Sequence, residues 1–352
     1  MTEAASATSE DAPQAIDRDP TLTIFLRRLV TIPATITATF LVVLAAPLWI
    51  PIAALIDGIR SKKTAAMRCG AFLCWYLQCQ TASIVAAFLT WLLSGVWAGA
   101  GRARYLRWSL QTHYLWASAL FWGASRIFGF RVEVEGKEAL EGSPILLLVR
   151  HASNADTLMP AVIVQMPTGI SLRYVIKREL LWDPCIDIVG NRLPYYFVRR
   201  SSGDPEREIR ALARLVRDIG PGEGVIIYPE GTRFTREKRA HIIERLRERR
   251  DHALAARAER LQNVLPPKPG GTLALLENNP GADAVFCAHV GFEGAGDLKD
   301  LWNGRIVDQV IRVRFWRVPY AEIPNGRENR IDWLFEHWTR VDDWIAAQEQ
   351  RH

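Results

Sequence analysis

The stretch ILLLVRHASNAD, residues 145–156, decides the fold. Its first five residues are apolar, which is typical of a strand that is buried on both faces. The run stops at Arg150, and His151, Ser153 and Asp156 follow at once. A turn at the end of a rigid strand is a place where proteins often present catalytic groups. We therefore expect the chemistry of this protein directly after this strand.

The surrounding pattern predicts an α/β domain over residues 130–325. Short apolar runs alternate with helical segments, which favours a mostly parallel sheet covered by helices. Asp204 and Pro205 are a good N-cap and first residue for one of these helices. We expect strands at 145–149, 172–176, 224–228, 284–290 and 307–315, and helices at 204–219, 235–261 and 329–349. The last of these is a C-terminal amphipathic helix within residues 326–352.

Residues 21–107 are expected to form a membrane-embedded helical hairpin that precedes this domain. Residues 29–56 and 69–101 contain no charged side chain, and each stretch exceeds the roughly 20 residues of helix that cross a bilayer. Pro33, Pro47 and Pro51 interrupt the first stretch. Basic residues flank both ends of the second stretch, so the distribution of positive charge gives no orientation. A hairpin that dips into one leaflet is favoured over two full spans.

Two shorter segments complete the predicted organisation. Residues 108–129 are expected to form an aromatic-rich interfacial helix, because Gln111 and His113 make it too polar to span a membrane. Residues 1–20 are expected to be a disordered acidic tail.

The amino-acid composition limits the classes of molecule that the protein is expected to bind. The chain has 352 residues, 13 Trp and a formal net charge of +6. The positive charge suits an anionic lipid surface or a phosphate-bearing substrate. Nucleic acid ranks low, because no basic run has interleaved aromatic residues. The five Cys show no CxxC spacing, so we expect buried reduced thiols and no metal site.

The pair His151 and Asp156, with four residues between them, suits general base catalysis, because a carboxylate can orient an imidazole that takes a proton from an alcohol. Taken alone this spacing is a weak signal, and a core histidine satisfied by a carboxylate is the alternative. Three more polar blocks follow in order: FVRR at 197–200, YPEGTR at 228–233 and LPPKPGG at 265–271. The arginines of the FVRR and YPEGTR blocks suit a phosphate group.

This order of blocks resembles the glycerolipid acyltransferase family, which includes the 1-acylglycerol-3-phosphate acyltransferases. His151 and Asp156 match the H-x4-D block of that family, and residues 230–233 match its E-G-T-R block in full. Phe197 and Arg200 match an F-x-x-R block, and residues 265–270 resemble its proline-containing block. Residues 177–190 also resemble the K-x-E-L…P…G stretch of the family.

The resemblance implies a mechanism and a set of site residues. His151 would be the general base on the sn-2 hydroxyl of lysophosphatidic acid, and Asp156 would orient it. The donor would be acyl-CoA or an acyl carrier protein, with no cofactor and no metal. The catalytic domain would face the cytoplasm, where such donors are found. Substrate binding would involve Arg199, Arg200, Glu230, Gly231, Thr232, Arg233, Pro266, Lys268 and Gly270.

Other functions remain open at this point. The acceptor could be another lysophospholipid, glycerol-3-phosphate or an acylated amino acid. A hydrolase is disfavoured because the sequence has neither a G-x-S-x-G elbow nor clustered metal carboxylates. A non-enzymatic scaffold that binds anionic lipid through its basic surface is the alternative from a different class.

Overall fold

The computed structural model describes residues 18–60, 64–199, 204–296 and 298–350. A seven-stranded sheet forms its centre, in the order β1-β7-β6-β2-β5-β3-β4. Of these pairings only β6 with β7 is antiparallel, so the prediction of a mostly parallel sheet is confirmed. The strands are β1 (Arg131–Glu135), β2 (Ile145–Val149), β3 (Ser171–Lys177), β4 (Tyr196–Val198), β5 (Glu223–Ile227), β6 (Asp283–Val290) and β7 (Val310–Val318).

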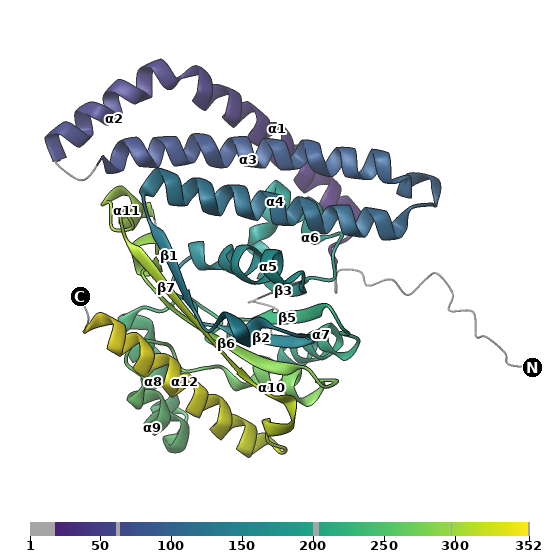
Figure 1. The fold of residues 1–352 in the computed structure, drawn as a ribbon, viewed down its shortest axis with the longest axis vertical. Coiled ribbons are helices and arrows are strands. Elements are labelled where there is room, and N and C mark those ends of the chain that lie inside the picture. The colour runs from purple at the N-terminus through teal and green to yellow at the C-terminus, as the bar shows by residue number, and fades with distance from the viewer. Residues whose placement is uncertain (1–17, 61–63, 200–203, 297, 351–352) are drawn as a thin grey trace, which may run out of the picture.

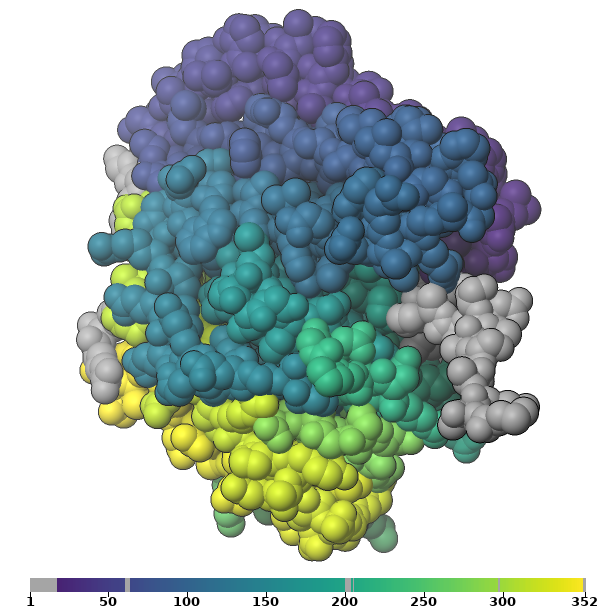
Figure 2. Space-filling model, turned by 45° about the vertical axis from the view of Figure 1, so that its right-hand side comes forward, coloured from purple at the N-terminus to yellow at the C-terminus, as the bar shows by residue number. Residues whose placement is uncertain are grey.

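Helices cover both faces of this sheet (Figure 1). One layer contains α1 (Thr21–Leu44), α2 (Ala46–Arg60), α3 (Ala65–Ser94), α4 (Arg102–Phe128), α5 (Met166–Thr168), α6 (Pro184–Gly190) and α11 (Leu298–Trp302). The other contains α7 (Pro205–Arg217), α8 (Arg236–Glu248), α9 (His252–Arg260), α10 (Pro269–Glu277) and α12 (Arg327–Glu349). Figure 2 shows the N-terminal helices at one end of the molecule and the C-terminal residues at the opposite end.

The central strand β2 explains why both layers form. Ile145, Leu147 and Val149 pack in the core under the N-terminal helices. Leu146 and Leu148 pack in the opposite core against α7, α10 and α12. Successive side chains of a strand point to opposite faces, so a wholly apolar strand needs a cover on each side.

The N-terminal region differs in detail from the predicted hairpin. The first uncharged stretch is divided between α1 and α2, which meet at an angle around Ala45. Pro47 lies in the first turn of α2, where its missing N–H costs no helical hydrogen bond. The interfacial helix expected within residues 108–129 already begins at Arg102, so α4 crosses the boundary predicted between residues 107 and 108.

The surface of this region is apolar. Thr21–Leu44 and Ala65–Ala98 are long and apolar enough to cross a membrane, judged by length and composition. Only 11% and 28% of the most apolar windows of these two segments are buried inside the protein. An exposed apolar surface of this kind indicates membrane association.

Several other boundaries correct the sequence-based prediction. The helix expected at 235–261 is two helices, α8 and α9, because Arg250 adopts a positive φ of 58° and the side chain of Asp251 caps α9. The last strand runs from Val310 to Val318 rather than over 307–315. Strands β1 and β4 and helix α10 were not predicted. The helix at 204–219 is confirmed as α7, with the Asp204 side chain accepting a hydrogen bond from the N–H of Arg207.

Candidate active site

His151 lies in the first turn after β2, on a backbone that Arg150 fixes. The Arg150 side chain is buried. Its guanidinium donates to the carbonyls of His289 at 2.6 Å and Asn263 at 3.1 Å, and it pairs with Glu293. Because these contacts come from two separate parts of the chain, near residue 263 and at 289–293, they hold the start of the His151 turn in one position.

His151 and Asp156 form a buried hydrogen-bonded pair. Nδ1 of His151 lies 3.0 Å from Oδ1 of Asp156. Oδ2 of Asp156 accepts the backbone N–H groups of Ala152 at 2.6 Å and Ser153 at 2.7 Å. Since a carboxylate only accepts, Nδ1 of His151 is the donor and Nε2 keeps the lone pair. This is the tautomer that a general base needs.

Two further side chains pack around this pair. The ring centroid of Tyr228 lies 4.8 Å from that of His151, and the Tyr228 hydroxyl donates to the carbonyl of Asp156 at 3.4 Å. Nε2 of His289 lies 2.9 Å from the carbonyl of Arg150 and 3.7 Å from Oδ2 of Asp156. Burial lowers the pKa of His289, so its ring is neutral near pH 7.

Glu230 ties two loops together beneath the site. It is fully buried. One carboxylate oxygen accepts the backbone N–H of His151 at 2.9 Å, and the other accepts that of Leu265 at 3.0 Å. Burial raises the pKa of Glu230 to about 8, against the two N–H donors and the charge of Arg150, which act to lower it. Glu230 thus joins the turn after β2 to the segment that leads into α10.

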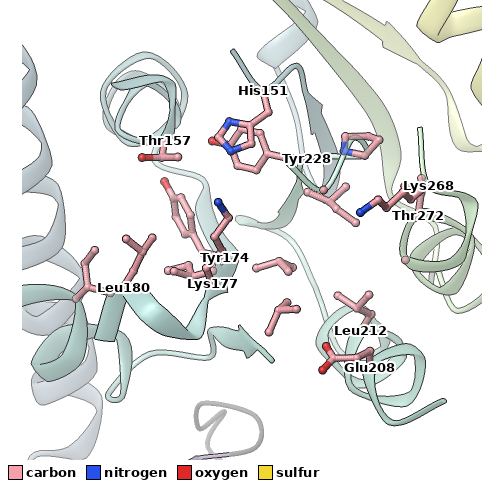
Figure 3. Close-up of a pocket in the computed structure, with 18 of the residues that line it drawn as sticks. His151, Thr157, Tyr174, Lys177, Leu180, Glu208, Leu212, Tyr228, Lys268 and Thr272 are labelled. Atoms are coloured by element: carbon pink, nitrogen blue, oxygen red, sulfur yellow. The ribbon is translucent and has the colours of Figure 1, made fainter. Parts of the chain in front are cut away.

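A cavity of about 800 Å³ opens beside His151. His151, Lys177 and Lys268 point into it from different elements (Figure 3). Much of its wall is apolar and comes from α4, the segment after His151, β3 and α6, with Trp116, Ala117, Leu158, Ala161, Ile176, Leu180 and Ile186 among the lining residues. The cavity therefore pairs a potential base with cations and with apolar surface, which suits an amphiphilic anion.

The structure brings part of the predicted set to this cavity. The lining residues include His151, Arg199, Gly231, Lys268 and Gly270. Gly231 has a positive φ of 66°, and a side chain there would come within 3.2 Å of Nζ of Lys268, so glycine suits the position. Lys268 is held by its backbone N–H, which donates to the carbonyl of Pro229 at 2.8 Å.

The remaining predicted residues lie elsewhere. Asp156, Glu230, Thr232, Arg233 and Pro266 do not line the cavity. The guanidinium of Arg233 donates to the carbonyl of Gly296, and the hydroxyl of Thr232 accepts from Nζ of Lys238 at 3.4 Å. Glu230 was expected to contact the substrate directly, but its side chain has no exposed surface and cannot do so. Arg200 lies outside the described residues.

Some residues of the site were missed by sequence reasoning. Lys177, at the end of β3, lines the cavity, and its signal was the K-x-E-L resemblance. Tyr228 lies two residues before the E-G-T-R block, but its aromatic contact with His151 has no sequence signature. Asp204 and Glu208 add carboxylates to the cavity wall. Within the described ranges, no group of three His, Cys, Asp or Glu side chains could hold a metal ion.

The sequence of the chain is similar to those of known acyltransferases. Residues 131–272 match the sequence profile of the Acyltransferase family. A Mus musculus protein described as 1-acyl-sn-glycerol-3-phosphate acyltransferase epsilon is 21% identical over 265 residues, which cover 72% of each chain. A 1-acyl-sn-glycerol-3-phosphate acyltransferase from Pseudomonas aeruginosa is 31% identical over 134 residues, 38% of this chain and 48% of that relative. This match thus spans about half the length of the Pseudomonas protein.

One solved structure is also similar. It is described as the 1-acyl-sn-glycerophosphate (LPA) acyltransferase from Thermotoga maritima, and it is 15% identical with a TM-score of 0.46. The alignment covers 76% of this chain and 98% of that one. The region matched by the family profile contains β1 to β5, the His151–Asp156 pair, the E-G-T-R block and the start of α10. Residues 131–272 therefore form a domain of the acyltransferase family, and the chain is an acyltransferase.

Proposed function

We propose that this acyltransferase moves a fatty acyl group from acyl-CoA or an acyl carrier protein onto the sn-2 hydroxyl of lysophosphatidic acid, which gives phosphatidic acid. The observation that carries the proposal is the 3.0 Å hydrogen bond from His151 to Asp156 beside a cavity lined with both cations and apolar side chains. The names of the two relatives supply the choice of acceptor.

The proposed reaction uses His151 as a general base. Nε2 of His151 takes the proton of the acceptor hydroxyl while the hydroxyl oxygen attacks the thioester carbonyl. A C–O bond forms, the C–S bond breaks, and the proton passes to the leaving thiolate. Asp156 stabilises the imidazolium that forms in between. No acyl-enzyme is needed, since the thioester is already activated.

The cationic residues of the cavity wall would bind the phosphate of the acceptor, and the apolar residues would bind its acyl chain. Lys177, Arg199 and Lys268 line the cavity and suit a phosphate group. By resemblance, Arg200, Thr232 and Arg233 would help to hold the same group, and Gly231, Pro266 and Gly270 would shape the loops around it. Glu230 would act through the backbone of His151. The exposed apolar helices would keep the protein at the bilayer, so that a lipid acceptor need not enter water. The catalytic domain would face the cytoplasm.

Acyl transfer by the purified, detergent-solubilised chain tests the proposal. Labelled acyl-CoA and acyl carrier protein would be offered with lysophosphatidic acid, other lysophospholipids and glycerol-3-phosphate. Wild type is compared with His151→Ala. The expected result is phosphatidic acid from the wild type only. Transfer to a different acceptor alone would retain the mechanism and replace the substrate. A folded protein that transfers to none of the acceptors would favour the scaffold that binds anionic lipid.

A further inference from the structure

The short segment before α1 places a carboxylate among arginines at the edge of the cavity. The side chain of Asp19 is only 1% exposed. It pairs with Arg27 of α1 at 2.7 Å, with Arg178 directly after β3, and with Arg199 directly after β4 at 3.7 Å. Each of the three guanidinium groups comes from a different element. The N-terminal segment is thereby joined to the catalytic domain through this one carboxylate.

Arg199 lines the cavity, and the register of the sheet places Arg178 next to it. Strands β3 and β4 are parallel neighbours, and Lys177 pairs in register with Val198. Arg178 and Arg199 are the next residues of their strands, so they emerge side by side at the same edge of the sheet. Lys177 and Arg199 themselves line the cavity. The basic residues around Asp19 therefore lie next to the basic residues that line the cavity.

The geometry of Arg199 leaves donors for a ligand. Its contact with Asp19 is long, at 3.7 Å, and within the described part of the chain its buried Nε has no hydrogen-bond partner. Arg27 is anchored independently, because it also donates to Asp187 of α6 at 3.1 Å. Removal of the Asp19 carboxylate would therefore leave Arg27 in place. Arg199, whose side chain is 32% exposed, would then lose its carboxylate partner and favour another anion.

We propose that Arg27 and Arg178 extend the phosphate site proposed above for Lys177, Arg199 and Lys268, and that Asp19 occupies this extension until the acceptor displaces it. A phosphate monoester carries more charge than a carboxylate and more acceptor oxygens, so it competes well for guanidinium forks. Asp19 would then lower the affinity for the phosphate group and couple acceptor binding to release of the segment that precedes α1. This inference rests on the proposed function, because it assumes an acceptor that carries phosphate.

Ligand binding to a catalytically inactive variant tests this inference separately from the proposed acyl transfer. The full chain carrying His151→Ala, in detergent, would be titrated with glycerol-3-phosphate by calorimetry, with and without Asp19→Asn. The Kd should fall on the order of fivefold in the Asp19→Asn variant, the scale of a partly exposed ion pair. Arg178→Gln should raise it by a similar factor.

Glu133→Gln is the matched control. It removes one negative charge from β1, at the opposite edge of the sheet from β4, and should leave the Kd unchanged. An equal or higher Kd in the Asp19→Asn variant would overturn the inference, even if acyl transfer is found. Tighter binding in Asp19→Asn without any acyl transfer would support the site and count against the proposed function.

Hydrogen exchange in a chain with no substitution at Asp19 covers the case in which Asp19→Asn does not fold. Amides of residues 18–24 should exchange faster with glycerol-3-phosphate present, and 1-monoacylglycerol, which lacks the phosphate, should have no such effect. Unchanged or slower exchange would overturn the displacement of Asp19. An effect of inorganic phosphate equal to that of glycerol-3-phosphate at the same concentration would overturn the assignment to a lipid acceptor.

Discussion

The carboxylate of Glu230 holds the backbone N–H of His151 at 2.9 Å, so an acidic residue of the E-G-T-R block positions the proposed base without touching its ring. The second oxygen of Glu230 holds Leu265 in the same way at 3.0 Å. One buried side chain therefore sets the spacing between two loops that border the cavity.

Glu230→Gln should lower both stability and turnover. Each oxygen of a carboxyl group, neutral or ionised, can accept a hydrogen bond, but an amide has only one oxygen, so one of the two backbone N–H groups would lose its acceptor and face an NH2 donor. We expect the free energy of unfolding to fall by about 1–3 kcal/mol. The kcat should fall as well, because the backbone of His151 loses its fixed position. Denaturant titration and kcat at saturating acceptor measure the two effects.

The exposed Glu133→Gln is the control for this substitution, and it should change the free energy of unfolding by less than about 0.5 kcal/mol. If Glu230→Gln also stays within that limit and retains its turnover, the two hydrogen bonds do not set the loop spacing.

Glu230 also predicts a pH dependence of stability. Its pKa is raised from 4.5 to about 8 by burial, so the folded chain holds this proton more tightly than the unfolded chain does. The resulting stabilisation is fully present below about pH 4.5 and is lost as the pH rises to about 8. We expect the free energy of unfolding of wild type, relative to Glu230→Gln, to fall by up to about 1 kcal/mol from pH 7 to pH 8.

This window lies above the range in which histidines dominate. Burial lowers the pKa of His113 and His337 to about 4, so their contributions change mainly between there and the value of about 6.5 in the unfolded chain. A flat difference curve between pH 7 and 8 would mean that Glu230 is ionised throughout, with its N–H donors outweighing its burial.

Local sequence patterns predicted the frame of the site. The apolar run 145–149 predicted β2, and the H-x4-D spacing predicted the turn in which the His151–Asp156 pair forms. Both features depend on neighbours in the chain. The Asp204 cap of α7 was predictable for the same reason.

Long-range contacts could not be predicted in this way. Glu230 acts on His151 across 79 positions of sequence and on Leu265 across 35. Asp19 reaches Arg178 and Arg199 from a segment that composition alone assigned to a disordered tail. Strand β4 has only three residues, too few for a periodic pattern, and its partner β3 defines it.

Asp156→Asn should remove most of the activity with little loss of fold. The asparagine oxygen can still accept the N–H groups of Ala152 and Ser153. Its NH2 group would then face Nδ1 of His151, which favours the tautomer with the proton on Nε2. That tautomer cannot accept the hydroxyl proton. We expect kcat to fall by about 100-fold or more, while the acceptor KM changes little.

The contrast with His151→Ala sharpens this test. The two variants should have similarly low kcat values, and the double variant should be no slower than either, because the pair acts as a unit. Multiplicative losses in the double variant would show that Asp156 contributes independently of His151.

His289 should prove to be a positioning residue for Asp156. Its buried Nε2 donates to the carbonyl of Arg150 and lies 3.7 Å from the Asp156 carboxylate. His289→Ala would leave a cavity and an unpaired carbonyl, so we expect a loss of about 2–4 kcal/mol in stability and a lower kcat. His289→Gln, which keeps an N–H donor, should recover part of the kcat. Equal kcat values in the two variants would limit His289 to packing.

The apolar surface of α1 predicts the strength of membrane binding. Leu41 and Leu44 are 54% and 64% exposed, and they lie on one face of the helix because they are three positions apart. Burial of each side chain in hydrocarbon contributes about 1.5–3 kcal/mol to membrane binding, so changing both to Glu should weaken vesicle binding by about 100-fold or more. Tyr320→Glu is the control, since Tyr320 is 46% exposed on the segment between β7 and α12. Co-sedimentation with phospholipid vesicles measures the binding, and acyl transfer to detergent-dispersed acceptor should change by less than about twofold because the cavity is untouched. Vesicle binding equal to that of Tyr320→Glu would mean that this part of α1 stays outside the bilayer, and that α2 and α3 carry the attachment.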